Sequence, residues 1–280
     1  MPNTTTLDGL IARSCEIPSA PPVVTQLMQL ISDPTVGAEA IGDALSHDPT
    51  LVAELLRVAN SPFYGRRGKV SNLASAVMVL GFHALRNLVV ALSTREIYGS
   101  FEGLPRVLWE HANAVGVVAG AVAKRVGMVS VEDAFAAGLL HDLGMLLLHK
   151  SDPDRYAGLL AAAPHLEALA EAEHQEWGFD HSEVGAAVAV HWSLPERMVQ
   201  VVGAVHHLDR VAEGGEPLRR LAACVVLADG LCAELGKAAL PVPDGWDGSE
   251  ALRLLDGRVV LDELRQIAAQ NLRAEADAPM

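Results

Sequence analysis

Ala134-Phe-Ala-Ala-Gly-Leu-Leu-His141-Asp142-Leu-Gly144-Met-Leu-Leu-Leu148 is the stretch of sequence that decides the fold of this chain. Ser130 and Asp133 precede it with the spacing of a helix-capping pair, and the residues that follow are apolar on almost every side. This pattern predicts one buried central helix over 134–148. A lone carboxylate buried there would cost several kcal/mol unless it were paired or bound to a cation. The adjacent His141 and Asp142 therefore require partners.

The composition favours packed helices over β-structure. Of the 280 residues, 50% are hydrophobic but only 4% are aromatic, and Ala, Leu and Val dominate the apolar set. Such residues suit helix-on-helix packing, and we predict an all-α protein, a multi-helix bundle with an N-terminal helical subdomain. We expect three segments: an N-terminal helical half over 10–105, a second helical half over 106–236 and a C-terminal helical extension over 237–280.

Proline, glycine and capping residues place the helix boundaries within these segments. A linker is expected over 99–105, and the chain from about Pro241 is weakly specified. Ser193 to Glu196 has the pattern of a capping box with a first-turn proline, which opens a helix ending at His206 and His207. The other predicted helices cover 22–31, 38–46, 49–59, 73–80, 83–97, 108–126, 152–176 with a break at Pro164, and 218–235. A further helix is predicted to open within Gly178 to Gly185 and to run toward His191 and Trp192.

The charge distribution limits the partners of the protein. The formal net charge is −14, and residues 1–105 contain 7 basic and 9 acidic side chains, so −12 lies after them. A polyanion would be repelled over most of this surface, and we expect no direct nucleic-acid binding. The basic loop Phe63-Tyr-Gly-Arg-Arg-Gly-Lys69 could receive a phosphate or an acidic partner, or it could be an ordinary solvated loop.

The sequence indicates a reducing compartment. Its three cysteines, Cys15, Cys224 and Cys232, are odd in number and lack a zinc-like pairing. The N-terminal residues have no basic region followed by an apolar region, and the apolar runs are too short to cross a membrane. We therefore expect a cytoplasmic protein with no membrane association.

Histidines and aspartates recur at helix positions in apolar surroundings. Imidazole nitrogen and carboxylate oxygen together suit a divalent transition metal such as Fe, Mn or Zn. A single buried histidine is more often a hydrogen-bonded core residue, so the metal interpretation depends on the fold bringing these residues together. The candidates are His111, His141, Asp142, His181, His206, His207 and Asp229, whereas His149 and His191 have no motif support.

The order of these residues resembles that of known families. His111, His141-Asp142 and Asp229 follow the H…HD…D order of the HD superfamily of metal-dependent phosphohydrolases. With His181 and His206-His207 the set is similar to the HD-GYP branch, which hydrolyses cyclic di-GMP at a site with two or three metals. Further motifs are Ile17-Pro-Ser-Ala-Pro21, Asp48-Pro-Thr-Leu-Val, Leu55-Leu-Arg-Val-Ala-Asn-Ser61 with Tyr64-Gly65, Leu80-Gly-Phe-His-Ala-Leu-Arg86, Ala137-Gly-Leu-Leu-His-Asp-Leu-Gly144, Asp180-His-Ser-Glu-Val-Gly185 and Trp192-Ser-Leu-Pro195. With these motifs the chain most resembles the HDOD domain family, a group of bacterial signalling modules, and this resemblance covers about residues 10–210.

The resemblance implies an all-helical, HD-like fold with a regulatory role. HDOD proteins are discussed as signalling or scaffold modules, and many have lost metal ligands, most of which this chain keeps. Two departures from the HD-GYP pattern count against hydrolysis. Met145 follows Gly144 where that pattern has a lysine that could donate a proton, and no Gly-Tyr-Pro follows His207.

Three hypotheses remain open from the sequence. The first is a signalling module that acts through contacts with unidentified signalling proteins, with or without a retained structural or vestigial metal. The second is a metal-dependent phosphohydrolase, whose ligand would be a cyclic dinucleotide or another phosphate compound. The third is a structural core whose histidines and aspartates satisfy one another without metal. For a metal site, we expect a first group of His111, His141, Asp142 and Asp229, and a second group of His181, His206 and His207, with Asp142 as the bridge.

Overall fold

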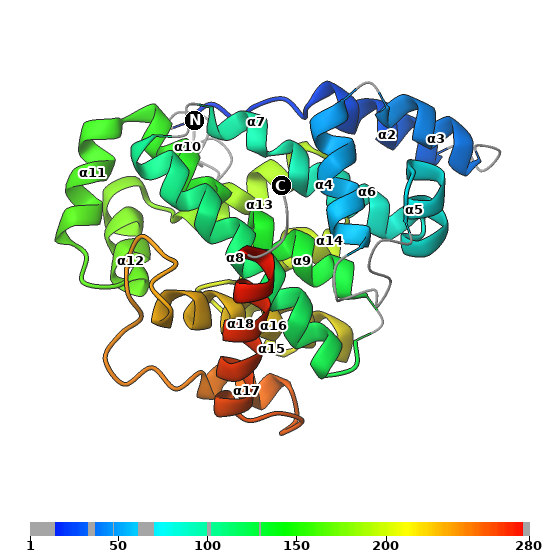
Figure 1. The fold of residues 1–280 in the computed structure, drawn as a ribbon. Coiled ribbons are helices and arrows are strands. Elements are labelled where there is room, and N and C mark those ends of the chain that lie inside the picture. The colour runs from blue at the N-terminus through cyan, green and yellow to red at the C-terminus, as the bar shows by residue number, and fades with distance from the viewer. Residues whose placement is uncertain are drawn as a thin grey trace.

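The computed structural model describes residues 15–32, 37–46, 48–60, 70–99, 102–128 and 130–276. These residues form helices and connecting turns with no strand among them, which confirms the all-α prediction (Figure 1). The helices are α2 (Pro22–Ser32), α3 (Ala38–Leu45), α4 (Pro49–Ala59), α5 (Leu73–Leu80), α6 (Phe82–Ser93), α7 (Arg95–Tyr98), α8 (Gly103–Arg125), α9 (Val131–Leu140), α10 (Leu143–Ser151), α11 (Pro153–Ala162), α12 (Leu166–Trp177), α13 (His181–His191), α14 (Glu196–Val202), α15 (Asp209–Ala212), α16 (Glu216–Glu234), α17 (Ser249–Leu254) and α18 (Leu261–Ala276).

The N-terminal helices form one side of the molecule. Helix α2 packs on α3 and α6, and α4 packs on α5 and α6. This part is blue to cyan in Figure 1 and meets the rest of the bundle where α6 contacts α9. The predicted helix over 83–97 is divided in the structure, because α6 ends at Ser93 and the short α7 follows Thr94. The buried side chains at the centre of this part are Leu27, Ile41, Leu55, Leu85 and Leu88.

Asn60 closes the loop between α4 and α5 with its side-chain amide. Its Nδ2 donates to the carbonyls of Leu56 (2.9 Å) and Val70 (2.7 Å), and its Oδ1 accepts from the amide of Val70 (3.1 Å). One side chain thus pairs both backbone groups of a residue ten positions away. The predicted basic loop 63–69 and the motif residues Ser61, Tyr64 and Gly65 lie outside the described residues.

We expect Asn60→Ala to lower the free energy of unfolding by about 2 kcal/mol, because Val70 is buried and would lose a donor and an acceptor together. Urea denaturation measures this loss. Asn271→Ala is the matched control, since Asn271 Nδ2 donates only to the Ile267 carbonyl within its own helix (2.9 Å). A control variant as unstable as Asn60→Ala would contradict the assignment.

Helix α8 is the central element of the second half. It packs on α9, α16 and α18. Helices α8 and α9 approach closely at two glycines, since a Cβ on Gly138 would lie 2.8 Å from the Cα of Gly116. Helix α8 begins at Gly103, within the predicted linker, because Pro105 can occupy the first turn, where its missing N–H has no helical partner. It ends as expected before Gly127, which has φ +71°.

The predicted continuous helix over 134–148 is wrong at its centre. Helix α9 ends at Leu140 and α10 begins at Leu143, so His141 and Asp142 form the junction. The Nδ1 of His141 donates to the Gly138 carbonyl (2.7 Å), the group that would accept the Asp142 amide in a continuous helix. The side chain of His141 thus takes the carbonyl that the Asp142 amide would use, and the helix is interrupted at His141 and Asp142.

Two capping predictions are also wrong. Ser130 lies at the N-cap of α9 but makes no side-chain cap, and Asp133 is instead paired with Asn87 (2.5 Å) and Arg197 (2.6 Å). Helix α14 has Pro195 rather than Ser193 at its N-cap. It ends at Val202, so the stretch that carries His206 and His207 is non-helical.

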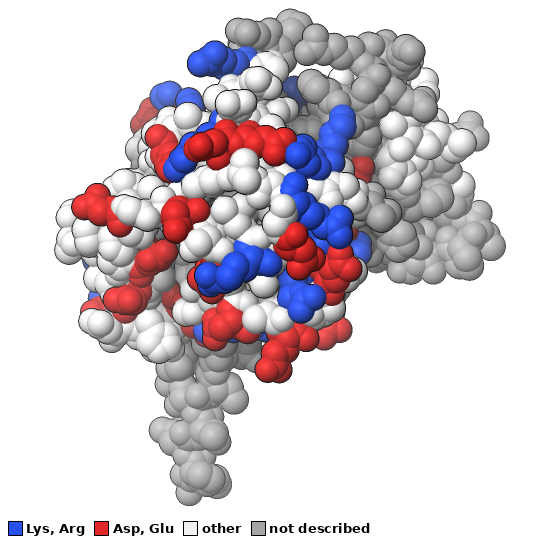
Figure 2. Space-filling model, turned by 90° about the horizontal axis from the view of Figure 1, so that it is seen from below, with Lys and Arg blue, Asp and Glu red and all other residues white. Residues whose placement is uncertain are grey.

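The C-terminal extension is more ordered than the sequence predicts. Helix α18 packs on α8 and α16 and buries Leu264 and Ala268, while Arg125 of α8 is paired with Glu263. Viewed from below, the described Lys and Arg side chains lie beside Asp and Glu side chains without an extended field of one sign (Figure 2). Among the described helices, none combines the length and apolar character that a membrane crossing requires.

Candidate metal centre

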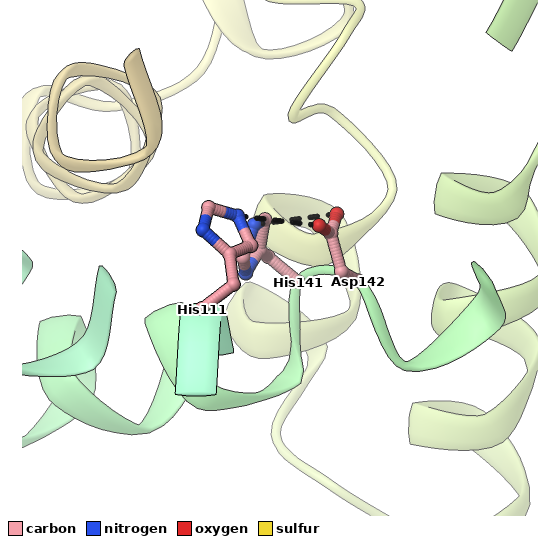
Figure 3. A group of neighbouring side chains, drawn as sticks. All are labelled: His111, His141 and Asp142. Atoms are coloured by element: carbon pink, nitrogen blue, oxygen red, sulfur yellow. Dashed lines mark ion pairs between the residues drawn. The ribbon is translucent and has the colours of Figure 1, made fainter. Parts of the chain in front are cut away.

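Three elements bring four of the candidate ligands together in the core. His111 comes from α8, His141 and Asp142 come from the α9–α10 junction, and Asp229 comes from α16. The Nε2 of His111 lies 3.4 Å from Asp142 Oδ2 and 3.1 Å from Asp229 Oδ1. The Nε2 of His141 lies 3.2 Å from Asp142 Oδ1 and 3.8 Å from Asp229 Oδ1. Figure 3 shows both imidazoles directed toward the Asp142 carboxylate.

Backbone carbonyls fix the tautomers of both imidazoles. The Nδ1 of His111 lies 2.6 Å from the carbonyl oxygen of Lys237, and the Nδ1 of His141 lies 2.7 Å from that of Gly138. A carbonyl can only accept, so each Nδ1 carries a proton. In the neutral ring, Nε2 then carries a lone pair and no proton. Here that lone pair faces carboxylate oxygens, which also carry lone pairs and no proton. A proton on each Nε2 or a cation between them has to relieve this repulsion.

Buried polar atoms without hydrogen-bond partners indicate that these residues fit a bound cation. The Nε2 atoms of His111 and His141 and the Oδ1 atoms of Asp142 and Asp229 are buried without a hydrogen-bond partner. Buried polar atoms in folded proteins are almost always paired, so four such atoms converging on one place indicate a ligand for them. Imidazole nitrogen and carboxylate oxygen are the donor set that Fe, Mn and Zn accept.

The electrostatics show how strongly the groups interact. Burial disfavours the charged form of His111, but the neighbouring carboxylates of Asp142 and Asp229 outweigh it and raise its pKa to about 9. The pKa of His141 is raised for the same reasons, chiefly through Asp142. The pKa of Asp142 and that of Asp229 are lowered despite burial, because both imidazoles favour the carboxylates. Positive charge is therefore favoured at this place.

A second group shares Asp142 with the first. The Nε2 of His181, the first residue of α13, lies 3.7 Å from Asp142 Oδ1 and 2.8 Å from the Nε2 of His206. Burial lowers the pKa of His206 to about 4, and nearby His181 adds to this effect. Asp142, His181 and His206 can direct one ligand atom each to a common point. Asp142 thus lies where the sequence analysis expects a bridge.

His207 does not join either group. Its Nε2 lies 2.7 Å from Asp180 Oδ2, and its side chain is 36% exposed. Asp180 is the N-cap of α13, in a capping box with Glu183. The structure therefore pairs His207 with Asp180 and does not bring it together with Asp142, His181 and His206.

Sequence reasoning missed two buried carboxylates beside the site. Asp180 could have been found from the spacing Asp180-His-Ser-Glu183, which is typical of a capping box. Glu173 lies eight residues before His181 and carries no comparable signal, yet its Oε2 lies 2.6 Å from His181 Nδ1. Only the packing of α12 against the start of α13 reveals it.

A cavity of about 350 Å³ leads from the surface to Asp229 and His206. The segment after α16 and the start of α17 form much of its wall, and Trp246 lies directly on Gly230, where a Cβ would overlap its ring. The described residues that line the cavity include no Lys or Arg. Its acidic residues are Glu167, Asp229, Asp244, Asp247 and Glu250.

Comparison with protein families matches the HDOD domain over residues 17–208, most of the chain. The chain belongs to the HDOD domain family. The matched HDOD segment contains six of the seven candidate ligands and ends before Asp229. This is the family that the sequence analysis expects.

The chain is also similar to individual proteins and solved structures. The chain is 28% identical over 223 residues to an uncharacterised protein of Treponema pallidum (strain Nichols), and the match covers 77% of this chain but 42% of the relative. It is similar to the crystal structure of a predicted phosphohydrolase from Shewanella amazonensis SB2B, with 28% identity, 93% of each chain covered and a TM-score of 0.68. An HDOD domain protein from Geobacter sulfurreducens superposes with a TM-score of 0.68 at 23% identity, covering 96% of this chain and 95% of that one.

Proposed function

We propose that this protein is a signalling HDOD module whose buried centre holds a divalent transition metal, Fe, Mn or Zn, and which acts through contacts with other proteins. The observation that carries the metal is the convergence of four unpartnered atoms from His111, His141, Asp142 and Asp229. The two carbonyl bonds prepare the imidazoles for this role, because they leave both Nε2 lone pairs directed inward. Asp142 and Asp229 compensate the charge of the cation.

A bound metal would supply a strong local positive charge that orders the surrounding ligands. The residues themselves come from α8, the α9–α10 junction and α16, so their common partner ties three elements of the core together. Asp142 directs Oδ2 toward His111 of the first group, and its Oδ1 lies between His141 of the first group and His181 of the second. We infer that metal occupancy stabilises the arrangement of the second half that a signalling partner recognises.

Hydrolysis of a phosphate ester, such as a cyclic dinucleotide, is the second candidate function. The similarity to a predicted phosphohydrolase favours it. Two features oppose it. Met145 is buried and has no proton to donate at the position where the HD-GYP pattern has lysine. The approach to Asp229 is lined by carboxylates, which repel an anionic phosphate.

The test is elemental analysis of protein purified without added metal or chelator, together with turnover of bis-p-nitrophenyl phosphate and cyclic di-GMP. We expect bound Fe, Mn or Zn and no turnover above a metal-only blank. Protein that takes up none of these metals, even after incubation with each, would contradict the metal centre. Metal-dependent turnover would replace the regulatory proposal with hydrolysis.

A further inference from the structure

We infer that Glu173 is a positioning residue that sets the metal affinity of the second group by holding His181, an inference that rests on the proposed metal centre. Glu173 is fully buried on α12, 0% exposed, and belongs to neither group of candidate ligands. Both of its carboxylate oxygens accept hydrogen bonds from neighbouring residues. Oε2 accepts from the His181 amide (2.8 Å) and lies 2.6 Å from His181 Nδ1, and Oε1 accepts from the Tyr156 hydroxyl (2.7 Å).

Glu173 determines which nitrogen of His181 reaches the second group. A carboxylate accepts and does not donate, so His181 Nδ1 carries the proton and Nε2 keeps its lone pair. That Nε2 is the atom 2.8 Å from His206 and 3.7 Å from Asp142. The bond to the His181 amide prevents the carboxylate and the first turn of α13 from separating. The orientation of the ring is thereby fixed before any cation binds.

The two groups differ in the acceptor to which the Nδ1 of each imidazole donates. His111 and His141 donate to neutral backbone carbonyls, whereas His181 donates to a buried carboxylate. A carboxylate behind a histidine raises the basicity of the ligating nitrogen, and loss of such a partner weakens metal binding about 10- to 100-fold. Glu173 therefore acts on the second group and leaves the first group unchanged.

Glu173→Gln separates this charge effect from the shape of the site. A glutamine oxygen can accept the same two bonds from His181, and its NH₂ can donate to the Tyr156 oxygen, so the variant removes the negative charge and the acceptor of the Tyr156 hydroxyl proton while it keeps the shape. Tyr156→Phe is the matched control, because it removes the hydroxyl and keeps the carboxylate on His181. The His181 tautomer can be read from ¹⁵N NMR of the imidazole nitrogens in metal-free protein.

The experiment is a calorimetric titration of the metal-stripped full chain with Mn²⁺ or Zn²⁺. We expect two steps in the parent protein, and in Glu173→Gln a second step weakened about tenfold or more with the first unchanged. Tyr156→Phe should keep both steps within a few-fold of the parent. The ¹⁵N spectrum of metal-free parent protein should show protonated Nδ1 and unprotonated Nε2 at His181.

Three results would overturn the inference. These are equal second-step affinities in parent and Glu173→Gln, a single binding step in the parent, or an unprotonated Nδ1 at His181 in the parent. None of them removes the first group, so each leaves the proposed metal centre standing. A parent that binds no metal would instead contradict the proposed function itself.

Discussion

Asp142→Ala will abolish retention of metal by the purified protein. Asp142 directs Oδ2 toward His111 and Oδ1 toward His141 and His181, so its loss removes the carboxylate that both groups share. The remaining carboxylate of the first group, Asp229, cannot replace it, because Asp229 approaches from α16 and lies close only to His111 and His141. Elemental analysis after identical purification of variant and parent measures the effect.

His207→Ala is the matched control for this variant. His207 is adjacent to the candidate ligand His206 but is paired with Asp180 outside both groups. We expect it to hold as much metal as the parent. If Asp142→Ala retains metal at the parental level, the assignment of the centre is wrong. Equal loss in both variants would show that metal retention depends on general stability.

Gly144→Ala will destabilise the whole second half by about 3 kcal/mol, the upper range for overpacking a rigid contact. A Cβ on Gly144 would overlap the carbonyl oxygen of His181, lie 2.8 Å from its carbonyl carbon and lie 3.0 Å from Val184 Cβ. Two of these contacts are with backbone, which cannot rotate away. Helices α10 and α13 would have to separate, and His181 would move away from Asp142.

Gly158→Ala is the control for the glycine. Gly158 lies within α11, is exposed, and a Cβ there would have no heavy atom within 4 Å. Alanine at an exposed helix position is favoured over glycine, so this variant should be more stable by about 0.5–1 kcal/mol. Urea denaturation compares the two variants. A Gly144→Ala protein with parental stability would show that α10 and α13 are less closely packed than the structure has them.

The sequence predicted most helices because their ends are marked by local chemistry. Prolines and glycines bound α4 and α5, whose predicted ranges are confirmed. The junction at His141 escaped prediction because it depends on a side chain capturing a main-chain carbonyl. The C-terminal extension was predicted to be helical, but the boundaries of α17 and α18 were not, for another reason. Their apolar residues gain stability by packing on α8 and α16, and a local pattern does not contain that contact.

The candidate site was predictable in its members but only partly in its geometry. The order of His111, His141, Asp142 and Asp229 along the chain pointed to residues that the structure brings together. The separation of His207 from His206 could not be predicted, because the pair lies in a non-helical stretch without periodicity. Glu173 could not be predicted either, since its role follows from burial and from contacts across a helix boundary.

The acidic cavity beside Asp229 would also affect how quickly a bound metal exchanges. The carboxylates that line the cavity attract small dications and slow the approach of polyanions, and salt screens this effect. A metal held beneath it would exchange readily with other dications in solution. A polyanionic chelator such as EDTA would extract it slowly, whereas a neutral chelator would meet no such barrier. The bound metal would thus exchange with dications in solution and would be removed only slowly by anionic chelators.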